Sequence, residues 1–369
     1  MTDDAPWLAS VRPSLGALSV YDVPRVHARA RMHANENPEP WPEHVMAALG
    51  DVVRTIELGR YPDTSGRELR EVLAARHDCD VGRIVLGNGS DEVISLLLIA
   101  LGGAARPVLV TPVPTFVMYA HAARVLGYEI REVELDEALQ LDEAGLDRAL
   151  AGATIAFFAR PNNPTGTLWS ADAIVRLVRA HPSVVFVVDE AYIAYAPGAS
   201  LWGRVWSSGE ADNVVFMQTL SKVGLAALRI GYAIADPRLA LALDKVRHPY
   251  NISQTSIAIA HTVLTRFAGE QAQMITRAIE CRDRLATMLA GIPGAQVFDS
   301  AANLVVVRLS PAARAPALVL ALAHAGILVK DVGHLPKLAG CIRASVGTMA
   351  ELDHVEATIA AWIAEEGAP

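Results

Sequence analysis

Short apolar runs alternate with longer helical patterns between residues 82 and 235, and this alternation limits the possible folds more than any other feature. The runs are rich in β-branched residues, and they recur as strands do when helices separate them. They cover residues 84–86, 108–110, 154–158, 184–188, 214–217 and 232–234. Continuous apolar strands of this kind are typical of a mostly parallel sheet that helices cover on both faces. We therefore predict an α/β fold in which ligands bind beyond the carboxyl ends of the strands.

The length of 369 residues predicts more than one structural unit. After residue 237 the pattern becomes helical to about residue 289, and the remainder is typical of a compact α/β unit. We predict an N-terminal arm over residues 1–40, which is rich in proline and charge. A large domain is expected over residues 41–245. A smaller C-terminal α/β domain, which includes an interdomain helix, is expected over residues 246–369.

The composition narrows the expected partners and location. Hydrophobic residues make up 52% and charged residues 20%, which is typical of a well-packed globular protein. The formal net charge of −8 argues against nucleic acid or an anionic membrane as the main partner. Cys79, Cys281 and Cys341 are isolated and lack metal-ligand spacing, so we expect no metal site and a reducing cytoplasm. The acidic N-terminus does not resemble a signal peptide, and no apolar run approaches the roughly 20 residues of a spanning helix.

Lys222 directly follows the apolar run 214–217, beside Ser221 and seven positions before Arg229. A lysine at the end of a buried strand must be solvated, paired or used as an amine nucleophile. Next to a hydroxyl and near an arginine, its amine suits Schiff-base formation with an aldehyde cofactor that carries a phosphate. A surface lysine in a strand-to-helix turn is the alternative for this motif taken alone.

A glycine-rich segment at residues 87–92 follows the first strand and opens a helix that we expect over residues 93–101. Glycines let backbone amides approach an anion, and a helix N-terminus favours negative charge. The segment therefore predicts a phosphate site at Ser90 and Asp91. An ordinary helix capped by Ser90 or Asp91 is the alternative.

Three more residues follow strand ends. Asp189 ends the run 184–188, and a carboxylate at the edge of a buried sheet needs a cationic partner such as a protonated pyridine nitrogen. An N-cap or a structural ion pair is the alternative for Asp189. Asn163 lies in the rigid turn 161–166 and can donate to a ring hydroxyl, although a plain turn also explains it. Phe116 can stack on a flat cofactor or pack in the core.

The order of these motifs resembles that of the fold-type I pyridoxal-phosphate aminotransferases, and among them the histidinol-phosphate aminotransferases. The resemblance extends over nearly the whole chain. Further matching segments are residues 34–38, 60–63, 249–253 and 341–348. The resemblance implies the fold-type I architecture, pyridoxal 5'-phosphate as the cofactor, and a homodimer whose active sites are shared.

The resemblance also implies roles for the residues of the cofactor site. Lys222 would link covalently to the cofactor and carry the proton between the substrate and the cofactor. Asp189 would pair with the ring nitrogen, while Asn163 and Tyr192 would contact the ring hydroxyl. Phe116 would stack on the ring, where the family often has tyrosine. The residues that would hold the phosphate are Ser90, Asp91, Ser221, Arg229 and, from the other subunit, Tyr61.

The resemblance also places four residues around the substrate. Arg343 matches an arginine that grips a substrate carboxylate in a bidentate fork. Tyr21 aligns with a tyrosine near the substrate phosphate, and Asn37 lies in a loop that sets specificity. Lys330 occupies a position where many relatives have an arginine for that phosphate. A lysine keeps the positive charge but lacks the bidentate geometry of a guanidinium. The implied reaction, in histidine biosynthesis, moves an amino group from histidinol phosphate, or a related amino compound, to 2-oxoglutarate.

Other functions share the same cofactor motifs. An aromatic amino acid aminotransferase is the nearest alternative, and a threonine-phosphate decarboxylase is a more distant one, because specificity depends on the loops around the site. A non-catalytic regulator that binds pyridoxal phosphate is an alternative from another class. It would need an attached DNA-binding module with a basic surface, and the short acidic N-terminus leaves no room for one.

Overall fold

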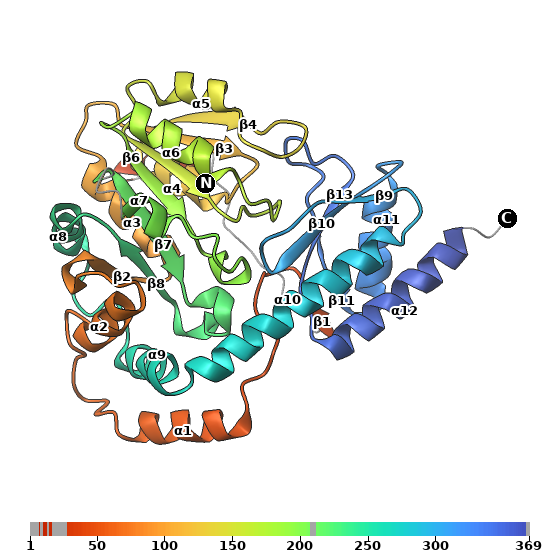
Figure 1. Cartoon of the computed structure of the whole chain (residues 1–369), viewed down its shortest axis with the longest axis horizontal. Coiled ribbons are helices and arrows are strands. Elements are labelled where there is room, and N and C mark those ends of the chain that lie inside the picture. Colours follow the sequence, from red (N-terminus) through yellow and green to blue (C-terminus); the bar gives the residue numbers. More distant parts are fainter. Residues whose placement is uncertain (1–6, 8–9, 13–14, 17–27, 207–211, 367–369) are drawn as a thin grey trace.

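The computed structural model describes residues 28–206 and 212–366, together with residues 7, 10–12 and 15–16. This part of the chain forms a larger body around a seven-stranded sheet and a smaller body around a four-stranded sheet. The long helix α10 (Ala268–Ala290) runs from one body to the other (Figure 1). The predicted α/β class with a smaller C-terminal α/β unit is therefore confirmed. Tyr21 lies outside the described residues.

The large sheet has the strand order β2-β8-β7-β6-β5-β3-β4. The five strands from β7 to β4 are parallel to one another, and β8 is antiparallel to both of its neighbours. The prediction of a mostly parallel sheet is thus confirmed. The strands are β2 (Ile84–Asn88), β3 (Val108–Val113), β4 (Glu129–Glu134), β5 (Ile155–Ala159), β6 (Val185–Asp189), β7 (Val214–Thr219) and β8 (Ile230–Ile234).

The connection from β7 to β8 departs from the expected alternation of strand and helix. Two short 3-10 turns, Ser221–Val223 and Ala226–Leu228, stand there in place of an α-helix. Gly224 and Arg229 have φ angles of 91° and 52°, and such left-handed conformations turn the chain back sharply. Strand β8 therefore returns antiparallel beside β7.

Helices cover both faces of the large sheet, as expected for buried parallel strands. Successive residues of β5 point to opposite faces, so Phe157 and Phe158 belong to two different apolar cores. Helices α3, α4 and α8 pack on the face of Phe157. The helices of the larger body are α1 (Glu43–Arg54), α2 (Arg67–Arg76), α3 (Ser90–Leu101), α4 (Met118–Leu126), α5 (Glu143–Leu150), α6 (Ala171–Ala180), α7 (Trp202–Trp206), α8 (Pro237–Val246) and α9 (Gln254–Arg266).

The smaller body has the strand order β12-β13-β10-β9, and its strands are antiparallel. A separate parallel pair joins β1, from the predicted arm, to β11. Helix α9 packs against α1 and α2 of the larger body, and the predicted boundary at residue 246 stays a prediction. The remaining elements are β1 (Ala30–Arg31), β9 (Ala295–Val297), β10 (Leu304–Leu309), α11 (Arg314–His324), β11 (Ile327–Leu328), β12 (Lys330–Asp331), β13 (Cys341–Ser345) and α12 (Met349–Glu366).

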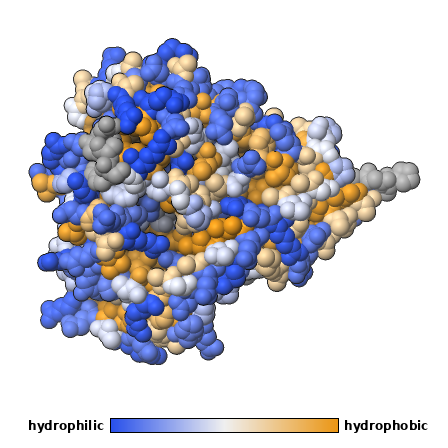
Figure 2. Space-filling view, in the orientation of Figure 1, coloured by the Kyte–Doolittle hydropathy of each residue, from blue (hydrophilic) through white to orange (hydrophobic). Residues whose placement is uncertain are grey.

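Hydrophilic residues cover most of the face shown in Figure 2, and apolar residues reach the surface mainly in the middle of the view and over the smaller body. Such scattered apolar exposure is normal for folded domains. Within the described ranges, no helix has both the length and the apolar character that crossing a membrane requires.

Candidate active site

The loop that carries Lys222 lies at the carboxyl end of β7, and neighbouring side chains hold it rigidly. The Tyr195 hydroxyl donates to the Lys222 carbonyl at 2.5 Å. The Gln271 amide donates to the carbonyl of Val223 at 3.2 Å, and the Trp41 indole donates to that of Gly224 at 2.8 Å. Three successive carbonyls are thus bound by side chains from other elements. This loop positions the lysine far more firmly than an exposed surface turn would.

The amine of Lys222 points toward the inner end of the predicted arm. Nζ donates to the carbonyl of Ala34 at 3.4 Å and lies 5.8 Å from the centroid of the Tyr192 ring. Among the described residues, no carboxylate forms an ion pair with Lys222. An amine without an acidic partner is available for nucleophilic attack on an aldehyde.

Asp189, at the end of β6, is almost fully buried, and each carboxylate oxygen already accepts one hydrogen bond. The Tyr119 hydroxyl donates to Oδ2 at 2.5 Å, and the Ala191 amide donates to Oδ1 at 2.9 Å. Burial raises the pKa of Asp189 to about 6, and these two hydrogen bonds oppose the shift. No lysine or arginine within the described part of the chain forms an ion pair with this carboxylate. The remaining lone pairs suit a cationic N–H donor from a ligand.

Tyr119 is a site residue that the sequence did not identify. It is fully buried on α4, three positions after Phe116, and stacks on Phe157 with ring centroids 4.6 Å apart. Burial, and then the neighbouring Asp189 charge, raise its pKa well above the ordinary value, so the hydroxyl keeps its proton and donates. Nothing in the local sequence distinguishes Tyr119 from a core aromatic residue.

Asn35 is the second unpredicted residue, and it connects three predicted ones. Its side-chain amide donates to the Tyr192 hydroxyl at 2.9 Å and to Asn163 Oδ1 at 3.2 Å. Asn163 Oδ1 also accepts from the Arg343 guanidinium at 2.7 Å. Four segments therefore meet at one point: the arm, the loop after β5, the loop after β6, and β13. Asn35 Oδ1 is buried without a hydrogen-bond partner, which indicates space for a donor from a ligand.

The predicted phosphate residues also lie together. The Arg229 guanidinium donates to Ser221 Oγ at 3.4 Å and to Asp91 Oδ2 at 3.2 Å. Helix α3 begins at Ser90 and has no side-chain cap, so the alternative of a helix capped by Ser90 or Asp91 is wrong. The uncapped backbone amides at this N-terminus are free to bind an anion. Gly89 has a φ angle of 77°, a left-handed conformation that residues with a Cβ rarely adopt, which explains the glycine.

Phe116 and Tyr61 occupy different environments. Phe116 is half-buried and meets Tyr119 edge to face at a centroid distance of 5.5 Å. Its ring therefore lies beside the hydrogen bond between Tyr119 and Asp189. Tyr61 is 81% exposed and stacks on Tyr250 at 4.5 Å. Its hydroxyl makes no hydrogen bond to any residue that the structure describes. The roles proposed for both rings stay predictions.

Lys330 and Arg343 lie directly opposite each other on the antiparallel strands β12 and β13. Side chains at paired positions project from the same face of a sheet, so two cations stand side by side. Burial, and then the Arg343 charge, lower the pKa of Lys330. Lys330 has neither an ion pair nor a hydrogen bond within the described ranges. Two adjacent cations suit a doubly charged anion.

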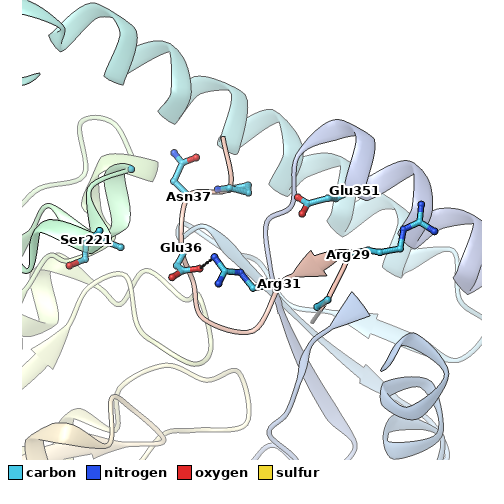
Figure 3. A pocket seen from close by; sticks show the side chains of 11 residues that line it. Arg29, Arg31, Glu36, Asn37, Ser221 and Glu351 are labelled. Atoms are coloured by element: carbon cyan, nitrogen blue, oxygen red, sulfur yellow. Dashed lines mark ion pairs between the residues drawn. The ribbon is translucent and has the colours of Figure 1, made fainter. Parts of the chain in front are cut away.

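A cavity of about 360 Å³ lies where the arm, the loop after β7 and α12 meet (Figure 3). Six residues of the arm and four of the loop after β7 line it together with Glu351 of α12; they are Ala28, Arg29, Arg31, Glu36, Asn37 and Pro38, and Ser221, Gly224, Ala226 and Ala227. Asn37 lines the cavity, and its side-chain amide donates a long hydrogen bond, 3.5 Å, to the Met274 carbonyl. Ser221, the neighbour of Lys222 in the chain, lines this cavity.

The chain is similar to known proteins over most of its length. The model of the family "Aminotransferase class I and II" matches residues 30–359. Histidinol-phosphate aminotransferase 2 of Nitrosococcus oceani is 37% identical over 95% of this chain and 96% of that protein. Histidinol-phosphate aminotransferase of Acidovorax sp. is 39% identical over 94% and 95% of the two chains. The crystal structure of histidinol-phosphate aminotransferase from Sinorhizobium meliloti in complex with pyridoxal-5'-phosphate has a TM-score of 0.82, 25% identity, and coverage of 96% and 98%. The similarity thus extends through both bodies.

Proposed function

The chain belongs to the class I and II aminotransferase family, and on this basis we propose that it transfers the amino group of histidinol phosphate to 2-oxoglutarate with pyridoxal 5'-phosphate as cofactor. The observation that carries the proposal is the meeting of Lys222, Asp189 and the Ser221–Arg229 pair at one edge of the large sheet. The names of the relatives at 37% and 39% identity support the choice of donor.

The residues present fit this cofactor. The uncapped start of α3, with Ser221 and Arg229, would hold the phosphate, while Asp189 would accept the ring N–H. Asn163 and Tyr192 would contact the ring hydroxyl, with Phe116 against the ring. When bound, the cofactor supplies an aldehyde for amines and a ring that takes up the electron pair released at the substrate Cα.

The chain's own residues would then perform the proton chemistry. The amine of Lys222 would take the proton from the substrate Cα, hold it and later return it. Asp189, held by Tyr119 and Ala191, would keep the ring nitrogen protonated. The rigid loop around Lys222 fixes the amine where the proton must be collected.

Tyr119→Phe should weaken binding of pyridoxal phosphate to the cofactor-free protein by roughly tenfold, about 1.4 kcal/mol, because it removes one hydrogen bond to the Asp189 carboxylate. The phenyl ring can still stack on Phe157. The dissociation constant is measured by titrating the cofactor-free protein with pyridoxal phosphate. Tyr128→Phe is the matched control, since Tyr128 donates to the backbone carbonyl of Leu98 at 2.6 Å. Equal affinities for the two variants would remove Tyr119 from this role.

The paired cations support a donor that carries a phosphate. In the proposed cycle, Lys330 and Arg343 would bind the phosphate of histidinol phosphate, and Arg343 would bind the carboxylate of glutamate in the second half-reaction. Tyr21 would also contact the phosphate, and Asn37 would face the donor from the cavity. Because glutamate has no phosphate, the two half-reactions should depend on the two cations to different extents.

Lys330→Ala should raise the Michaelis constant for histidinol phosphate by about tenfold and change the glutamate half-reaction little, because only the phosphate needs the second charge. Arg343→Lys keeps the charge but loses the planar fork, so it should weaken the glutamate half-reaction as well. Single-turnover absorbance changes of the cofactor measure each half-reaction separately. If Lys330→Ala leaves histidinol phosphate unaffected, the phosphate-binding role is lost.

We also propose a homodimer in which Tyr61 of each subunit contacts the cofactor phosphate in the other. The large exposure of Tyr61 and the free hydroxyl support this role, since tyrosine is typical of interfaces where one end of the ring is apolar and the other polar. Most soluble homo-oligomers have two-fold symmetry, which would create two equivalent shared sites.

A cytoplasmic location is part of the same proposal. Cys79, Cys281 and Cys341 are all free thiols, and Cys281 and Cys341 are buried. Free cysteines are typical of proteins kept in a reducing compartment.

A further inference from the structure

His33 lies on the arm next to the paired cations, and neither its position nor its chemistry is used by the proposed mechanism. The preceding residue, Met32, is 1% exposed and anchors the segment in the core of the smaller body. Its amide donates to the Leu328 carbonyl, and its carbonyl accepts from the Ser345 amide, both at 2.8 Å. These bonds fix the backbone at His33 beside β11 and β13.

Three cations, Arg31, Arg343 and Lys330, and one carboxylate, Glu36, lie near enough to His33 to affect the pKa of its imidazole. The Arg343 guanidinium donates to the carbonyl of His33 itself at 2.5 Å. Lys330 stands opposite Arg343 on the neighbouring strand. Arg31 forms an ion pair with Glu36 at 3.5 Å, and Figure 3 shows this pair within the cavity wall. The positive charge near His33 therefore exceeds the negative charge.

One nitrogen of His33 has no partner. Nδ1 is buried and lacks a hydrogen bond within the described part of the chain. Leaving a buried polar atom unsatisfied is costly, so such atoms often mark the place of a ligand or water. Burial is the main cause that lowers the pKa of His33. Glu36 opposes the shift, while Arg31, Arg343 and Lys330 add to it. The neutral form of the imidazole is therefore favoured over the charged form in the absence of an anion.

A phosphate monoester would reverse this balance. It carries close to two negative charges and three acceptor oxygens, so it can accept hydrogen bonds from several donors at once. A dianion placed between Lys330 and Arg343 stabilises a positive charge on any nearby imidazole. A carboxylate, with one charge and two oxygens, would do so more weakly. The protonated form of His33 should therefore be stabilised more by a phosphate dianion than by a carboxylate.

We propose that His33 is a third binding group for the substrate phosphate. Its imidazole donates a hydrogen bond to the phosphate and takes up a proton from solvent when the dianion binds. This inference rests on the proposed function, because it assumes a phosphorylated donor. It makes His33 a residue that favours phosphorylated over unphosphorylated donors. Binding of the phosphorylated donor should accordingly weaken as the pH rises and His33 resists protonation.

The test compares histidinol phosphate with histidinol, which has the same reacting amine and no phosphate. The apparent affinity of each donor is measured in the single-turnover half-reaction from pH 6 to pH 9, for the wild type and for His33→Ala and His33→Asn. We expect His33→Ala to bind histidinol phosphate about tenfold more weakly at pH 6.5, with a difference that shrinks toward pH 9. Histidinol and glutamate should change less than twofold.

The variants also separate the histidine from the ligand. The phosphate of the donor ionises with a pKa near 6, but every enzyme form shares that effect, so the ratio of wild-type to variant affinity isolates His33. His33→Asn keeps a polar amide and cannot titrate, so the wild-type/His33→Asn ratio should depend on pH even if the alanine variant does not fold. His181→Asn is the control, since His181 lies before the amino end of β6 and contacts Asp147.

The outcomes are distinguishable. If the wild type does not react with histidinol phosphate, the proposed function is wrong and this inference is lost with it. If the wild type reacts but both variants bind the donor normally at every pH, only the role of His33 is wrong. Equal losses for histidinol and histidinol phosphate would assign His33 a structural role and also overturn the inference.

Discussion

Lys222→Ala should lower the turnover number by on the order of 10⁴-fold or more, because the only amine at the end of β7 collects and returns the proton. The variant should still bind pyridoxal phosphate, since Ser221, Arg229 and the start of α3 remain in place. Its absorbance should be that of the free aldehyde. The rate of transamination and the bound-cofactor spectrum are measured on the same sample.

Borohydride reduction provides the control on the wild-type protein. The chain has only four lysines, Lys222, Lys245, Lys330 and Lys337, so peptide mapping after reduction can identify the modified one without ambiguity. We expect the label on Lys222 alone. A label on any of the other three lysines, or near-normal turnover in Lys222→Ala, would contradict the role of Lys222.

Asp189→Asn should lower the turnover number by at least about a hundredfold, close to 3 kcal/mol of transition-state stabilisation. A neutral amide cannot keep the ring nitrogen protonated, although the side chain keeps its size and one acceptor. Steady-state rates with saturating cofactor measure the effect. Near-normal turnover would mean that another group pairs with the ring nitrogen.

Asp189 should also affect the stability of the cofactor-free protein. Burial raises the pKa of Asp189 to about 6, above its ordinary value of roughly 4. The folded state therefore holds this proton more tightly than the unfolded state, and the free energy of unfolding should fall as the pH rises from about 4 to about 6. Asp189→Asn should lack this part of the pH dependence. Denaturant titrations of both proteins at several pH values provide the measurement.

The continuous apolar strands and the residues at their ends were predictable from the sequence. A strand buried on both faces has an unbroken apolar run, as at 184–188, and the carboxyl ends of parallel strands meet at one edge. Strand β4 (Glu129–Glu134) was missed because it lies at the edge of the sheet, and four of its six residues are charged. Its sequence therefore resembles a solvent-exposed segment.

The contacts within the site could not be predicted, because they depend on distant segments meeting. Asn35 reaches Tyr192 across 157 positions of the chain, and no local pattern indicates that pairing. Tyr119 resembles any aromatic residue on the buried face of a helix. The pairing of Lys330 with Arg343 depends on the register of two short strands. That register is a tertiary property, which the spacing of the residues along the chain does not determine.

A comparison of three amino donors in one assay tests most directly which of them the protein uses. The purified protein, saturated with pyridoxal phosphate, is given histidinol phosphate, phenylalanine or threonine phosphate together with 2-oxoglutarate, and kcat/KM is measured for each. We predict that histidinol phosphate reacts with the highest kcat/KM, by at least about tenfold over phenylalanine, because only the former presents a phosphate to Lys330 and Arg343. A higher value for phenylalanine, or release of carbon dioxide from threonine phosphate without transamination, would contradict the assignment.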